Sequence, residues 1–219
     1  MVTIDSDLVC MEQNTLGGTM DVSAFWDVIG EYNQATRYIQ LSLLALMGVA
    51  VFISFKFEKA IVLKVILGLI NLFIAFGFFF TYGTQPIQKY FAFPLFLLTG
   101  IIFLNEAIKN RDDHLQKPQV LHYVFFVLYL IYPLVSIAFG NTFPKMVTHI
   151  MPCPVATISL VLYSLYSKKN KALLALLTIW GLTGVKSVIF AAYEDIILLA
   201  AGIFGVTLLI NSVGKKTVN

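Results

Sequence analysis

The chain has 219 residues, of which 58% are hydrophobic, 14% aromatic and only 12% charged, and its formal net charge is +3. Soluble domains carry about 25% charged residues, so this composition excludes an ordinary soluble globular domain. The Lys and Arg residues lie mostly between apolar stretches, where membrane topology explains them, and nucleic-acid binding is therefore not expected. Apolar stretches near twenty residues recur along the whole length and predict an all-α integral membrane bundle, with the lipid bilayer as its surroundings.

Ahead of the first long apolar run, the segment MDVSAFWDVIGEYNQATRYIQ places aromatic and apolar residues at helical spacing among acids and amides. This pattern predicts an amphipathic interfacial helix that leads into the first span. The residues before it are too polar, and lack the basic start, for a cleaved signal peptide. We therefore expect residues 1–19 to form a disordered leader, or one outside the native product, and residues 20–219 to form a single transmembrane domain.

Seven transmembrane helices are predicted from apolar runs bounded by charged or turn residues. Their approximate ranges are 36–56, 60–82, 90–108, 119–140, 147–167, 171–193 and 195–213. One side of the membrane would hold Lys56, Lys59, Lys109, Arg111, Lys117, Lys168, Lys169, Lys171, Lys215 and Lys216, and the other only Arg37, Lys89 and Lys145. This bias predicts an outside N-terminus and a cytoplasmic C-terminus for a multi-pass protein of the cell membrane.

Several short segments resemble, in order, a known family. They are FWDVIGEYN near the start, INLFIAFGFFF and FAFPLFLLTGIIFL in the second and third spans, MPCP at the start of the fifth, and YEDIILLAAG in the last. Over about residues 20 to 213 the chain resembles an uncharacterised family of bacterial multi-pass membrane proteins, known only as a domain of unknown function. The resemblance implies the fold and no activity. A Tyr-His pair of that family, late in the second span, is replaced here by Ala75, Phe76 and Gly77.

The fifth span contains two prolines, Pro152 and Pro154, which bar a regular helix just upstream of them. A helix from Pro152 to about Ser167 would measure about 24 Å, which is shorter than the roughly 30 Å hydrocarbon core. Residues 146–152 are therefore expected to continue in an irregular form, surrounded by protein or by a water-filled cavity. Interrupted helices of this kind point to binding sites in transporters. The alternative is that a proline merely occupies the first helical turn.

A common depth is predicted for polar residues of several spans. Counting helical rise from the cytoplasmic side puts Lys186 of the sixth span and Cys153 of the fifth at about 22 and 21 Å. The predicted polar cavity in the outer half of the bundle is formed by Asn71, Tyr132, His149, Cys153 and Lys186, with Glu194 and Asp195 at its rim. In the alternative interpretations, Lys186 snorkels to the surface and the two acids only start the last helix.

Three classes of function stay open. The first is a non-enzymatic protein that binds or passes a small solute or ion, as a transporter, channel or sensor. One ligand of this class is a soft metal ion such as Cu(I), for which Met146, His149, Met151 and Cys153 would be the coordinating residues. The second is a membrane thiol enzyme with Cys153 as nucleophile and His149 as base. The third is an accessory subunit. A retinal protein is excluded because the lysine lies in the sixth span rather than the last, and the stretch FAFPLFLLTGIIFL of the third span has no carboxylate to serve as counter-ion. The sequence identifies no cofactor and no oligomeric state.

Small residues in the spans are expected to serve packing. We predict that Gly100, Gly181, Gly184, Gly202 and Gly205 permit close contact between helices.

Overall fold

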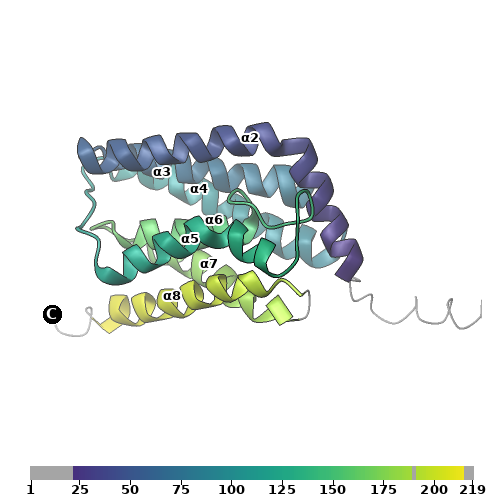
Figure 1. Ribbon diagram of the computed structural model, residues 1–219. Helices are drawn as coiled ribbons and strands as arrows, with labels where there is room; N and C mark the ends of the chain where they lie inside the picture. The colour runs from purple at the N-terminus through teal and green to yellow at the C-terminus, as the bar shows by residue number, and fades with distance from the viewer. Residues whose placement is uncertain (1–21, 189–190, 215–219) are drawn as a thin grey trace, which may run out of the picture.

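The computed structural model describes residues 22–188 and 191–214 (Figure 1). The leader predicted for residues 1–19 lies outside these residues. Within them the fold is all-helical, without a β-strand, as predicted. Its α-helices are α2 (Val22–Lys56), α3 (Ala60–Phe73), α4 (Phe93–Lys109), α5 (Val120–Ala138), α6 (Pro152–Ser164), α7 (Lys171–Leu182) and α8 (Ile196–Gly214).

Four shorter helical turns adjoin the ends of these α-helices. The π-helical turns η1 (Ile74–Phe80) and η2 (Gln88–Ala92) continue α3 and precede α4. The 3₁₀ turns η3 (Thr183–Val188) and η4 (Tyr193–Asp195) continue α7 and precede α8. With these turns included, five of the described helical segments are long and apolar enough to cross a membrane, namely 22–56, 60–80, 88–109, 120–138 and 193–212. The molecule is therefore a membrane protein, with α6 and α7 as shorter apolar helices.

The connections gather at two ends of the bundle (Figure 1). At one end, which we call the basic end, lie the turns 57–59, 110–119 and 165–170. At the opposite end, which we call the cavity end, lie the start of α2, the turn 81–87, the segment 139–151 and the turns η3 and η4. Most of the described lysine and arginine residues outside the helix centres are at the basic end.

The first helix differs from its sequence-based prediction. The expected interfacial helix and first span form one continuous helix of 35 residues, which bends in its N-terminal part (Figure 1). Trp26, Ile29, Tyr32 and Asn33 on that part are buried inside the molecule rather than directed toward lipid headgroups. The amphipathic pattern therefore reflects packing against the protein's own chain.

The short helix α6 is the centre of the bundle. It contacts α3, α5, α7 and α8, and all of its residues except Cys153 are buried. Its sequence PCPVATISLVLYS is apolar on every side, as expected for a helix without a lipid-facing or solvent-facing surface. Thirteen residues span only about 20 Å, so α6 ends well inside the bundle at its proline end.

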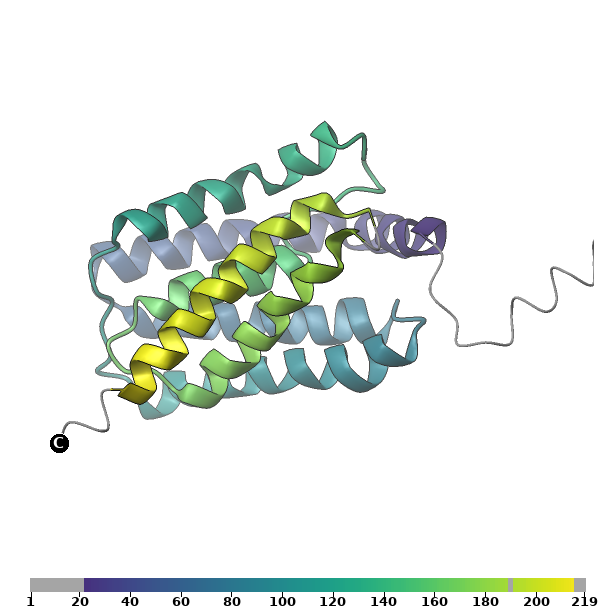
Figure 2. The same ribbon diagram turned by 90° about the horizontal axis from the view of Figure 1, so that it is seen from below.

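Helices α7 and α8 lie side by side (Figure 2) because glycines meet at their crossing. A Cβ atom built on Gly202 would lie 2.5 Å from the carbonyl carbon of Gly181, and one on Gly181 would lie 2.6 Å from the Cα of Gly202. These distances leave no room for a side chain. The prediction that Gly181 and Gly202 permit close helix contact is confirmed.

At the basic end, a buried ion pair joins α3 to the 110–119 turn. The Lys64 ammonium donates to Asp113 at 2.7 Å, and neither side chain is more than 1% exposed. Ser167 and the backbone N–H of Lys168 also donate to the Asp113 carboxylate, so this carboxylate fastens three separate stretches of chain together. Sequence reasoning treated Lys186 as the lysine inside a span and did not identify Lys64, which is the fully buried one.

Candidate functional site

The segment 139–151, between α5 and α6, is irregular, as predicted for the residues that precede Pro152. Its backbone carbonyls find donors on α2. The Asn33 amide nitrogen donates to the carbonyls of Pro144 and Met146 at 2.7 and 2.8 Å, and the Tyr32 hydroxyl donates to the Ile150 carbonyl at 2.7 Å. Non-helical backbone is tolerated at membrane depth only when protein or water satisfies it, so these polar residues of α2 make the irregular segment possible.

Pro152 is the first residue of α6, which it opens without needing a backbone donor. The two interpretations of this proline therefore hold together: it occupies the first helical turn, and the chain before it is irregular. The consequence is that Cys153, one residue further on, stands at the free end of a central helix and not on a lipid-facing surface.

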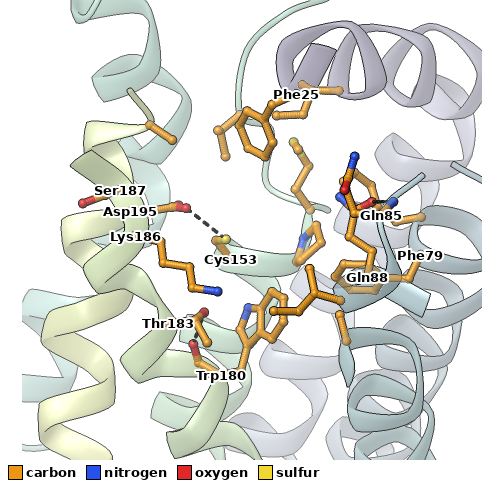
Figure 3. A pocket seen from close by; sticks show the side chains of 18 of the residues that line it. Phe25, Phe79, Gln85, Gln88, Cys153, Trp180, Thr183, Lys186, Ser187 and Asp195 are labelled. Atoms are coloured by element: carbon orange, nitrogen blue, oxygen red, sulfur yellow. Dashed lines mark hydrogen bonds between the residues drawn. The ribbon is translucent and has the colours of Figure 1, made fainter. Parts of the chain in front are cut away.

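A polar cluster joins α5, α6 and η4 at this point. The Tyr132 hydroxyl donates to one oxygen of Asp195 at 2.7 Å, and the Cys153 thiol donates to the other at 3.2 Å (Figure 3). Both oxygens of the carboxylate are therefore engaged by the protein. Three of the predicted cavity residues, Tyr132, Cys153 and Asp195, are brought together here from positions as far as 63 residues apart.

The neighbouring acid has a different environment. Glu194 is fully buried, and its Oε1 accepts a hydrogen bond from Ser136 of α5 at 2.7 Å. Its Oε2 has no hydrogen-bond partner among the described residues. The Ser136 hydroxyl also accepts from the backbone N–H of Val147. Glu194 therefore links the start of the last helix to α5 and to the segment 139–151, instead of only starting a helix.

A cavity of about 440 Å³ opens beside this cluster at the cavity end (Figure 3). Its volume is within the range of about 300 to 1,000 Å³ that is usual for small-molecule pockets. Most of its wall is apolar and aromatic, and is formed by Phe25, Ile29, Phe78, Phe79, Ile87, Phe91, Ala92, Val147, Met151, Pro152, Trp180 and Ala192. The polar lining residues are Gln85, Gln88, Cys153, Thr183, Lys186, Ser187 and Asp195. The cavity is thus amphipathic, whereas the sequence predicted a polar one.

Lys186 lines this cavity together with Cys153, although it is not inside a regular span. The helix predicted over 171–193 ends at Leu182. Lys186 lies beyond it in the 3₁₀ turn η3 and is exposed. Figure 3 shows its side chain extending across the cavity toward Trp180. No ion pair with Lys186 occurs among residues 22–188 and 191–214.

Two other predicted residues lie elsewhere. Asn71 is fully buried between α3 and α6, where its amide nitrogen donates to the Leu67 carbonyl at 2.8 Å and to Ser159 at 3.1 Å. His149 packs its ring on Tyr129, with Nε2 at 3.2 Å from the Leu130 carbonyl. Neither residue lines the cavity.

The geometry does not unite the residues predicted to hold a soft metal. Met151 and Cys153 line the cavity, whereas Met146 and His149 do not. The Met151 sulfur accepts a hydrogen bond from the Thr148 N–H at 3.3 Å. In the described part of the chain, no group of three or more His, Cys, Asp or Glu side chains is placed to hold a metal ion. The soft-metal site stays a prediction that this geometry does not support.

Sequence reasoning missed the residues that form the opposite wall. Gln85 and Gln88 follow the second span and face Lys186 and Cys153 across the cavity (Figure 3). The Gln88 side-chain oxygen accepts from the backbone N–H groups of Thr84 and Gln85, at 2.9 and 3.1 Å. The available signal was the pair of glutamines in TYGTQPIQKY, beside aromatic runs on both sides.

Comparison with known proteins places the chain in a family. The model of a family of unknown function, DUF6064, matches residues 22–219. The resemblance to an uncharacterised family is therefore confirmed. No curated protein and no solved structure matches the chain.

Proposed function

The chain belongs to DUF6064, a family of unknown function, and on the geometry of its cavity we propose that it is a non-enzymatic membrane protein that binds a small solute. The observation that supports this proposal is the amphipathic cavity of about 440 Å³, which is lined by residues of α2, η1, η2, α6, α7, η3 and η4. Pockets of this size with apolar walls and a few convergent polar groups are the usual sites for small molecules.

The cavity lies where the helical pattern is interrupted. The irregular segment 139–151 and the free end of α6 form one wall, and the turns η1, η2 and η3 form others. Transporters bind their substrates at such discontinuous helices, so passage of the bound solute, or sensing of it, is the wider function we propose.

The thiol-enzyme alternative has less support. The Cys153 thiol donates a hydrogen bond to Asp195, and the ring of His149, which this alternative takes as the base, is bonded to the Leu130 carbonyl instead. The thiol–imidazole pair on which this alternative depends is therefore not formed. We therefore keep solute binding as the proposal, with an accessory subunit as the outcome if the cavity admits nothing.

The cavity can be tested with its own cysteine. Cys153 is the one cysteine left after Cys10→Ser, and N-ethylmaleimide is a small, membrane-permeant reagent that must enter the cavity to reach it. In lipid nanodiscs, Cys153 should be alkylated in the folded protein, and Thr183→Phe, which fills the cavity, should slow the alkylation. Because N-ethylmaleimide attacks the thiolate and Cys153 is hydrogen-bonded to Asp195, a cysteine introduced at Thr183, which also lines the cavity, serves as a second reporter. If both cysteines react only after unfolding in detergent, the cavity is closed and the solute-binding function is wrong.

We also propose that all seven helical segments, α6 and α7 included, cross the cell membrane as a multi-pass bundle, with the cavity end outside and the basic end in the cytoplasm. The grouping of lysine and arginine residues at the basic end supports this orientation. Cysteines introduced at the exposed positions Thr142 and Lys168 test it in intact cells. A membrane-impermeant reagent should label position 142 and not 168, and the reverse result would overturn the orientation.

A further inference from the structure

We propose that the solute of this cavity is an amphipathic anion, a carboxylate or similar monoanionic head attached to an apolar body. This inference rests on the proposed solute-binding function and specifies its ligand class. It follows from a comparison of the hydrogen-bond donors and acceptors that line the cavity.

The charged acceptor of the lining is already in use. Asp195 is the one carboxylate that lines the cavity, and its two oxygens accept from Tyr132 and Cys153. The side-chain oxygen of Gln88 accepts from two backbone N–H groups. The lining therefore offers a cationic ligand no free carboxylate, and its other side-chain acceptors, on Gln85, Thr183 and Ser187, are neutral oxygens.

The donors are not in use. The Lys186 ammonium extends into the cavity without an ion pair among the described residues (Figure 3). The indole N–H of Trp180 is buried, and no oxygen or nitrogen of the described residues accepts it; the Cys153 sulfur beside it is only a weak acceptor. The Gln88 amide nitrogen also bonds to no described residue, since the hydrogen bonds of its side chain are those of its oxygen.

A buried donor without an acceptor, such as the Trp180 N–H, is costly, and a negatively charged partner forms the strongest hydrogen bonds with an ammonium such as that of Lys186. A ligand that supplies negatively charged acceptor oxygens would satisfy the Lys186 ammonium and the Trp180 N–H, since both residues line the cavity and the Lys186 side chain points toward Trp180 (Figure 3). Its remaining surface must be apolar, because Phe25, Phe79 and Phe91 form much of the remaining wall. A hydrophilic anion such as inorganic phosphate would leave this aromatic wall without a partner.

Two sources can provide such a molecule: a free amphipathic carboxylate, or an anionic lipid of the bilayer. Both present the same chemistry to the cavity, and the experiment separates them by the composition of the nanodisc.

The test uses three probes of equal chain length: octanoate, octanol and octylamine. The protein is the full chain with Cys10→Ser, in nanodiscs of zwitterionic phosphatidylcholine, and the rate of Cys153 alkylation by N-ethylmaleimide reports occupancy. Octanoate should slow the alkylation much more than octanol or octylamine. Lys186→Met should weaken the apparent octanoate affinity about 10- to 100-fold, as expected for the loss of one charged hydrogen bond, and Lys186→Arg should retain protection.

The matched control is Lys89→Met, which removes a lysine at the same end of the bundle that does not line the cavity. It should leave protection by octanoate unchanged. A cysteine at the exposed position 142, in a variant without Cys10 and Cys153, should react at the same rate with and without octanoate, which excludes a general effect on the membrane. Protection by phosphatidylglycerol nanodiscs without octanoate would identify a bilayer lipid as the occupant, and protection by octanoate alone would identify a free carboxylate.

Equal protection by the three probes, or unchanged protection in Lys186→Met, would overturn the anionic ligand class. The anionic ligand class would also be overturned if octanoate gave no protection while N-ethylmaleimide still alkylated Cys153 and Thr183→Phe still slowed the alkylation. In that case the proposal of a solute-binding cavity would stand. If N-ethylmaleimide reaches neither Cys153 nor a cysteine at position 183 in the folded protein, the proposed function itself fails.

Discussion

Removal of one charge from the buried pair between Lys64 and Asp113 should destabilise the protein strongly. The substitution Asp113→Asn keeps the shape of the side chain and an oxygen that can accept from Ser167 and from the Lys168 N–H. It leaves the Lys64 ammonium, which is 0% exposed, without a counter-charge. Breaking a buried pair in this way costs about 3 to 5 kcal/mol, which reduces the folding equilibrium constant by at least about a hundredfold.

The same reasoning predicts a partial rescue. In the double variant Lys64→Met with Asp113→Asn, neither charge is left unpaired, and replacement of a buried pair by neutral groups is often close to neutral in stability. We expect the double variant to lie within about 1 to 2 kcal/mol of the wild type, so that the two substitutions are strongly non-additive. The π-face of Tyr166, whose ring centre is 4.6 Å from the Lys64 nitrogen, cannot replace the carboxylate.

Unfolding in mixed micelles by titration with sodium dodecyl sulfate, followed by tryptophan fluorescence, measures these free energies. The control is Asp27→Asn, which breaks the pair with Lys145, in which both side chains are 56% exposed. An exposed pair contributes at most about 1 kcal/mol, so this variant should unfold almost as the wild type does. If Asp113→Asn is as stable as Asp27→Asn, or if the double variant is less stable than either single one, the pair does not tie the basic end together.

Three further predictions concern pH, packing and the irregular segment. Burial raises the pKa of Asp113, but hydrogen bonds from Lys64, Ser167 and the Lys168 N–H outweigh it and hold the pKa below its usual value of 3.8. The stabilisation by this ionised carboxylate is therefore complete above pH 3.8 and is lost as the pH falls through the lower pKa of the folded state. When the unfolding free energy is measured as a function of acid pH, Lys64→Met should show a smaller loss of stability than the wild type. Gly202→Val should lower the unfolding free energy by about 1 to 3 kcal/mol in the same assay, because α7 and α8 must separate to admit the side chain. The control Gly48→Val, with no atom within 4 Å of its added Cβ, should lower it much less. Equal losses of unfolding free energy in the two variants would contradict the close contact. Asn33→Leu removes the donor to the Pro144 and Met146 carbonyls and should speed tryptic cleavage after Lys145, and an unchanged cleavage rate would show that α2 does not hold this segment.

Features that depend on local chemistry were predictable from the sequence. Apolar length identified the five helical segments that are long and apolar enough to cross a membrane, and the Pro-Cys-Pro element located both the start of α6 and the irregular chain before it. Cys153 and Lys186 both line the cavity, but the residue count that placed them at one depth assumed a regular sixth helix, whereas α7 ends at Leu182.

Features that depend on distant contacts were not predictable. Nothing near Lys64 indicates that its partner lies 49 residues away in a turn. The polar residues of α2 were assigned to a membrane interface because the segment 139–151, their actual partner, is more than 100 residues distant in sequence. The count for Lys186 assumed a regular rise to residue 193, whereas a 3₁₀ turn with a larger rise per residue begins at Thr183.

The central position of α6 has a consequence for biogenesis. A helix of 13 residues with an irregular lead-in is a poor membrane span by itself, and the side chains that bind it and its lead-in come from α2, which is synthesised earlier, and from η4, which is synthesised later. The middle of the protein therefore cannot reach its final form while the ribosome is still producing it. The cavity can therefore form only after the residues of η3 and η4 have been synthesised.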